Sequence, residues 1–170
     1  FWYHPHFDTE RQVDGGLYGA LIVEDPSEPT LDDELVLLFD MQMEFDHQLN
    51  ALADGLEGRP AHGHGRRKSQ WLVNGVPAPF NFVATGGSRV RVRIINVSNV
   101  GYLSLSWPEM RQIAGDQGLL PSPQEPDSLL LAPGDRVEVE WLVGASGFDV
   151  VNEAWSLNGG PSYEPDQVLV

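Results

Sequence analysis

The sequence contains no cysteine, which removes several chemistries at once. Disulfide bonds, thiol catalysis and cysteine-based zinc sites are all excluded within these 170 residues. A type 1 copper site is excluded as well, because it needs a cysteine thiolate together with two histidines. The lack of disulfides does not decide between an oxidising and a reducing compartment.

Long apolar runs and positive charge are also scarce. No run approaches the roughly 18 apolar residues that a membrane helix needs, so the sequence predicts no membrane partner. Ten Lys and Arg residues stand against 25 Asp and Glu residues, which gives a formal net charge of −15. Such an acidic balance disfavours nucleic acid and anionic membranes as partners.

Two histidines, His4 and His6, stand one residue apart near the start of the sequence. In an extended strand alternate side chains share a face, with their roots about 6.6 Å apart, so both imidazoles can point into one space and bind a metal. Pro5 between them has no N–H for a sheet ladder, which places this piece at a sheet edge or a strand end. Taken alone, the pair also fits two half-exposed surface histidines.

The residues around this pair resemble a segment of the laccase-like multicopper oxidases. They read Phe-Trp-Tyr-His-Pro-His, then Gln12, then Gly-Leu-Tyr-Gly-Ala-Leu-Ile-Val-Glu-Asp-Pro. In that family the segment is the second of four His-x-His copper motifs and closes the first cupredoxin domain. The resemblance implies that His4 and His6 are type 3 copper ligands, one to each copper of the pair in a trinuclear cluster.

The same resemblance implies an activity and a compartment. The intact enzyme would couple one-electron oxidation of a small reducing substrate to the reduction of oxygen to water, and it would be periplasmic or secreted. Only two of the cluster's histidine ligands match positions in this sequence. We therefore expect a fragment that is inactive alone and whose partners are the remaining multicopper oxidase domains.

The rest of the sequence predicts an all-β fold. Short strand-like runs recur about every ten residues, with Gly, Pro and Asn turns between them, as in a β-sandwich. The patterns at residues 73–75, 91–96 and 131–139 resemble the second, copper-free domain of three-domain multicopper oxidases. The expected fold class is an all-β, cupredoxin-like Greek-key β-sandwich with an N-terminal partial cupredoxin segment.

An acidic, proline-rich stretch predicts a domain junction near residue 30. We expect residues 1–30 to be the last strands of a first cupredoxin domain and residues 31–157 to be a second domain without copper. Residues 158–170 are expected to be a linker toward a third domain. A two-domain layout is disfavoured because the sequence contains no His-Cys-His motif.

Three local patterns give further expectations. Residues 20–23 read as a buried strand, whereas residues 119–126 contain three prolines and read as a loop. Arg89, Arg91 and Arg93 alternate with aliphatic residues. This period of two predicts three outward-facing cations that pair with surface carboxylates in solvent.

A second His-x-His motif, His62-Gly63-His64, precedes three cations, Arg66-Arg67-Lys68. The glycines and the positive charge indicate a solvated loop rather than a copper site, because nearby cations oppose metal binding. One open alternative is a non-catalytic β-sandwich in which these histidines join His4 and His6 around a metal. Another is a structural domain that shares only the fold with the oxidases.

Overall fold

The structure, a computed structural model, describes residues 1–44, 68–144, 150–152 and 167–170. The described part contains one helix, α1 (Thr9–Asp14). Its strands are β1 (Trp2–Tyr3), β2 (Gly19–Ala20), β3 (Asp33–Glu44), β4 (Lys68–Val73), β5 (Val76–Pro77), β6 (Arg89–Asn96), β7 (Leu103–Ser106), β8 (Met110–Gly115), β9 (Gly118–Gln124), β10 (Leu129–Leu131), β11 (Arg136–Leu142), β12 (Val151–Asn152) and β13 (Gln167–Val168).

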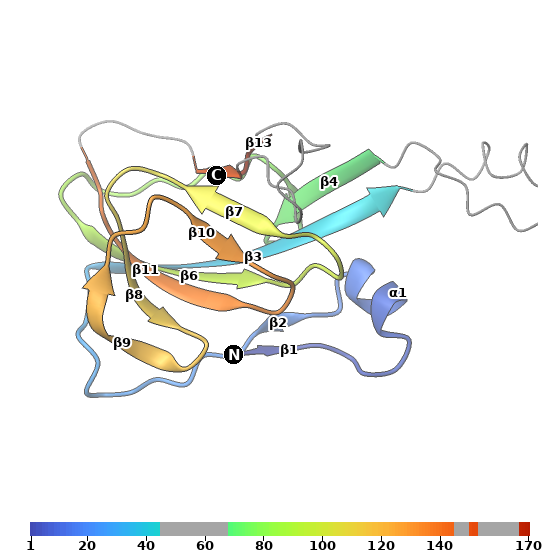
Figure 1. Cartoon of the computed structure of the whole chain (residues 1–170), viewed down its shortest axis with the longest axis horizontal. Coiled ribbons are helices and arrows are strands. Elements are labelled where there is room, and N and C mark those ends of the chain that lie inside the picture. The colour runs from blue at the N-terminus through green and yellow to red at the C-terminus, as the bar shows by residue number, and fades with distance from the viewer. Residues whose placement is uncertain (45–67, 145–149, 153–166) are drawn as a thin grey trace, which may run out of the picture.

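Two sheets form a sandwich (Figure 1). The larger sheet has seven strands in the order β5-β4-β3-β6-β11-β8-β9, and the smaller has four in the order β10-β7-β12-β13. β3 and β6 run parallel, with Leu35 opposite Val92 and Leu37 opposite Ile94. β6 and β11 run antiparallel, with Val92 opposite Val139.

The core lies between the two sheets and follows from the alternation along their strands. Val90, Val92 and Ile94 of β6 are at most 4% exposed, and their inward side chains meet those of the other strands. The largest fully buried side chains include those of Trp71, Phe39, Leu37, Leu103 and Leu105. The expected all-β, cupredoxin-like sandwich is therefore confirmed.

One turn follows from its residue types, whereas the expectation at the sheet edge is wrong. Asn74 and Gly75, with φ of 53° and 79°, form the turn between β4 and β5, where positive φ favours these residue types. The predicted loop at residues 119–126 is wrong, because β9 runs through most of it. β9 is an edge strand of the larger sheet and pairs only with β8. Its prolines have no backbone N–H to donate, and they are tolerated there because the outer side of an edge strand has no neighbouring strand to bond.

The C-terminal end corrects part of the expected linker at residues 158–170. β13 pairs with β12 in the smaller sheet, and Leu169 is fully buried in the core. Residues 167–170 therefore belong to the sandwich. Residues 158–166 lie outside the described residues, and the other predicted domain boundaries stay predictions.

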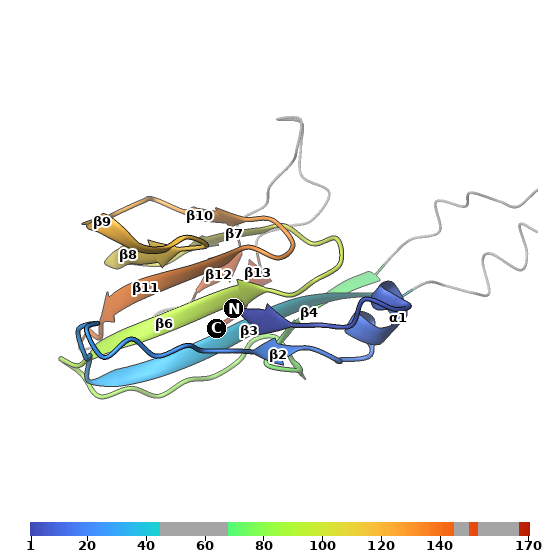
Figure 2. The ribbon, with the colours of Figure 1, turned by 90° about the horizontal axis from the view of Figure 1, so that it is seen from below.

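The N-terminal segment, residues 1–23, forms a small unit of its own on the outside of the larger sheet (Figures 1 and 2). β1 and β2 pair with each other, with Trp2 opposite Ala20, and α1 lies between them in sequence. The predicted buried strand at residues 20–23 is wrong, because β2 ends at Ala20 and the next three side chains are exposed. No further described strand joins the β1–β2 pair.

Candidate functional site

His4 and His6 follow directly after β1, where the chain leaves the two-stranded sheet. Their ring centroids are 4.9 Å apart and the ring planes are inclined by 21°. The Trp2 ring stacks on the other side of His4, with its centroid at 4.0 Å. The two imidazoles therefore lie side by side, as the strand spacing predicts.

The chain between the histidines and α1 is held by local hydrogen bonds. The Thr9 hydroxyl donates to the Pro5 carbonyl at 3.0 Å, and the Gln12 side-chain amide donates to the Phe7 carbonyl. Asp8 has a φ of 47°, and its carboxylate pairs with Arg11 one turn into the helix. These contacts fix the turn that carries His6 away from the sheet. Sequence patterns gave no sign of this short helix.

The donor set fits half of a metal site. His4 is half-buried, and its Nδ1 is buried with no hydrogen-bond partner. A buried nitrogen is left in this state when a group from outside these residues completes the site. Metal–imidazole bonds are about 2 Å long, so one ion spans two nitrogens at most about 4 Å apart. Among the residues that the structure describes, no group of three or more His, Cys, Asp or Glu could hold a metal ion.

The other histidine motif cannot be placed beside this pair. His62 and His64, the members of the alternative four-histidine site, lie outside the described residues. Whether His62 and His64 bind a metal therefore stays a prediction.

A buried polar junction fixes α1 to the sandwich. Asp40 of β3 is fully buried, and its Oδ2 accepts a hydrogen bond from the Tyr18 hydroxyl at 3.3 Å. Asn99 donates to the Asp14 carboxylate at 2.6 Å, and Gln42 donates to the Asp14 carbonyl at 3.1 Å. All three contacts join the N-terminal segment to the sandwich. We call these five residues the polar junction.

Burial and the nearby Asp14 carboxylate raise the pKa of Asp40 to about 6, against the lowering effect of hydrogen bonds from Tyr18 and the Met41 amide. Burial and the Asp40 charge also raise the pKa of Tyr18. The Oδ1 of Asp40 is buried without a hydrogen-bond partner. Sequence patterns gave no sign of this group, because it is one acid among 25.

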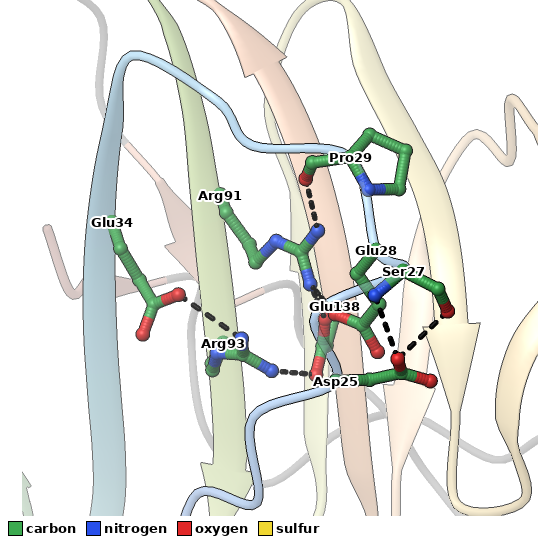
Figure 3. Close-up of polar contacts among 8 residues, drawn as sticks. All are labelled: Asp25, Ser27, Glu28, Pro29, Glu34, Arg91, Arg93 and Glu138. Atoms are coloured by element: carbon green, nitrogen blue, oxygen red, sulfur yellow. Dashed lines mark hydrogen bonds and ion pairs between the residues drawn. The ribbon is translucent and has the colours of Figure 1, made fainter.

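A second anchor is the strap, residues 24–32, which crosses the outer face of the larger sheet (Figure 3). Arg91 of β6 donates to the Pro29 carbonyl at 2.9 Å and forms ion pairs with Glu28 of the strap and Glu138 of β11. Its side chain is only 6% exposed. The predicted solvated position of Arg91 is therefore wrong, because the strap covers that face of the sheet.

The neighbouring arginines of β6 complete this network. Arg93 pairs with Glu34 at 3.0 Å and also with Glu138 (Figure 3), while Arg89 pairs with Glu140 at 2.8 Å. Arg89 is half exposed, as the alternation predicts. At the start of the strap, Asp25 accepts hydrogen bonds from the Ser27 amide and hydroxyl, which close a local turn.

A cleft of about 560 Å³ lies between the N-terminal segment and the larger sheet, with Ile22 on one side and Arg93, Arg136 and Glu138 on the other. The segment leaves many large apolar side chains exposed: Phe1, Tyr3, Phe7, Leu17, Leu21 and Val23. Only Val13 among its large apolar residues is buried. Much of the segment's apolar surface is therefore left uncovered by the sandwich. No helix in the described part is long and apolar enough to cross a membrane.

The fold is similar to that of solved multicopper oxidases. Over 99% of this chain the structure is similar to the laccase-like multicopper oxidase CueO from Ochrobactrum sp., with a TM-score of 0.69, 27% identity and 38% of that chain covered. It is similar over its whole length to Lac15 from a marine microbial metagenome, with a TM-score of 0.64, 26% identity and 39% of that chain covered.

A curated relative carries a different kind of name. The chain is 35% identical to the cell division protein FtsP of Escherichia coli over 99% of its own length. It spans 38% of the length of that relative. No family model matches the chain.

Proposed function

We propose that this chain is part of a copper-dependent oxidoreductase and that His4 and His6 are two ligands of its copper centre, one to each type 3 copper. The observation that carries the proposal is the side-by-side placement of the two imidazoles at the end of β1. Similarity to solved multicopper oxidases supports it. The remaining ligands, the type 1 site and the substrate site would come from residues outside these 170.

Each part of the described chain has a role in this proposal. His4 and His6 would hold copper, because imidazole suits that metal, and the copper would supply the redox chemistry that links a small reducing substrate to oxygen. Trp2 stacks on His4 and restricts its ring, while Gln12 and Thr9 fix the turn after His6. The sandwich holds this segment through the strap and the polar junction. The intact protein is proposed to be periplasmic or secreted, with the remaining oxidase domains as partners.

Copper binding by the chain tests the proposal. We expect equilibrium dialysis with Cu(II) to show weak binding that is lost in a His4→Ala/His6→Ala double variant. A His62→Ala/His64→Ala double variant is the matched control and should bind as the unaltered chain does. The chain alone should show no oxygen uptake with a phenol. Copper binding that survives the loss of His4 and His6, or turnover by the pure chain, would contradict the proposal.

A second candidate is a copper-independent role in cell division. The name of the 35% identical relative favours it. The two candidates separate in a cell whose gene for the intact protein is deleted. If the intact protein with His4→Ala and His6→Ala restores normal cell length as well as the unaltered protein does, the role in division does not need copper. Failure of only the histidine variant would favour the oxidoreductase.

A further inference from the structure

We propose that the polar junction is a pH-dependent latch, which holds the N-terminal segment on the sandwich while Asp40 is protonated and loosens when Asp40 ionises. The latch does not depend on copper. It concerns the contact between the N-terminal segment and β3, and it adds a dependence on pH to the holding role that the proposed function gives this contact.

The junction is placed where it can control docking. The Tyr18 hydroxyl reaches Asp40 from the segment, and Gln42 and Asn99 reach Asp14 from the sandwich. Asn99 also donates to the Glu10 carbonyl at 3.1 Å, so it holds both ends of the short helix. Because the segment buries so little apolar surface, these hydrogen bonds carry much of its attachment on this side.

The surroundings of Asp40 favour its neutral form on balance, because burial and the Asp14 charge outweigh the hydrogen bonds from Tyr18 and the Met41 amide. From the N-terminal segment, Asp14 and Tyr18 face it, and the first of these is itself a carboxylate. Within the larger sheet, Asp40 lies opposite Leu72 of β4. The residue before it, Phe39, is the last residue of β3 that pairs with β6. In the described ranges no Lys or Arg forms an ion pair with Asp40. Ionisation of Asp40 therefore places a second negative charge close to the Asp14 carboxylate. The Oδ1 of Asp40 has no hydrogen-bond partner in this state.

The direction of the effect follows from proton linkage. The pKa of Asp40 is about 6 in the docked state, above the ordinary value of 3.8. Release of the segment takes the Asp14 charge and the Tyr18 side chain away from Asp40, so its pKa should then fall toward the ordinary value. The docked state therefore binds the proton more tightly. Docking is strongest below pH 3.8, weakens as the pH rises toward 6, and remains weak above that. The docking equilibrium constant should fall by up to roughly a hundredfold across this window.

Hydrogen exchange of the chain without metal measures this latch. Protection of the α1 amides is compared with protection of the β6 amides at several pH values, after correction for the intrinsic pH dependence of exchange. We expect α1 protection relative to β6 to fall by up to about a hundredfold between pH 4 and pH 7. In Asp40→Asn, which cannot ionise, the relative protection should be independent of pH.

Two further variants keep the test decisive if Asp40→Asn folds poorly. Asp14→Asn removes the neighbouring charge from the segment side and should move the midpoint of the transition to lower pH. Asp127→Asn changes an exposed carboxylate between β9 and β10 and should leave the profile unchanged. Protection that rises with pH, or the same midpoint in Asp14→Asn and the unaltered chain, would overturn the latch.

Discussion

Replacement of Arg91 by methionine should destabilise the sandwich far more than the same change at Arg89. Both residues lie on β6, two positions apart, and each pairs with carboxylates across the sheet. Arg91 is 6% exposed and has three acceptors, whereas the Arg89 side chain is 51% exposed. The two variants therefore compare an arginine–carboxylate ion pair in a buried position with one in an exposed position.

The magnitudes follow from burial. Methionine at position 91 leaves Glu28 without its cation beneath the strap, and breaking a buried ion pair costs about 3 to 5 kcal/mol. Glu138 keeps its contact with Arg93, so the lower end of this range, about 3 kcal/mol, is expected. An exposed pair contributes less than about 1 kcal/mol, so Arg89→Met should be nearly neutral.

Urea unfolding followed by tryptophan fluorescence measures both variants. The slope of the transition should be unchanged, and its midpoint should fall strongly only for Arg91→Met. A cycle with Glu28→Gln should give a coupling energy of about 1 to 3 kcal/mol, because the two side chains are in contact. Equal losses in the two arginine variants, or no coupling to Glu28, would show that the strap does not bury this ion pair.

Three other changes test separate parts of the fold by the same unfolding assay. Asn74→Ala removes the side-chain bonds to the Leu38 amide and Val36 carbonyl and a favoured positive φ, so a loss of about 2 kcal/mol is expected; a neutral result would contradict it. Gly101→Ala places a Cβ 2.7 Å from the buried Trp71 ring, which should cost about 1 to 3 kcal/mol, and an unchanged midpoint would argue against that packing. Asp40→Asn should remove a decline in stability of up to about 3 kcal/mol between pH 3 and pH 7, whereas an unaltered slope would show that Asp40 does not titrate there.

Sequence periodicity predicted the sandwich because its strands have a clear inside and outside. The alternation on β6 placed Val92 and Ile94 in the core correctly. It also placed Arg91 in solvent, which is wrong, since periodicity reports the side of a sheet and not what covers that side. The six residues of α1 are too few for a helical pattern, and their attachment depends on contacts with Asn99 and Gln42 far along the chain.

The candidate site was predictable only as a pair of residues. The spacing of His4 and His6 indicated rings on one side, and the ring stacking agrees with that expectation. Metal binding by the pair stays a prediction. The buried carboxyl of Asp40 could not be found in the sequence, because only the fold brings it next to Asp14.

The weak apolar attachment of the N-terminal segment bears on any copper measurement with this chain. Its exposed side chains, among them Phe7 and Val23, would be covered if further residues completed the small β1–β2 sheet. Without that cover, the strap and the polar junction hold the segment that carries the histidines. Copper affinity is then reduced both by missing ligands and by a segment that is less firmly held. Asp40→Asn alters only the second cause, so tighter copper binding in this variant at pH 7 would show that docking limits the affinity.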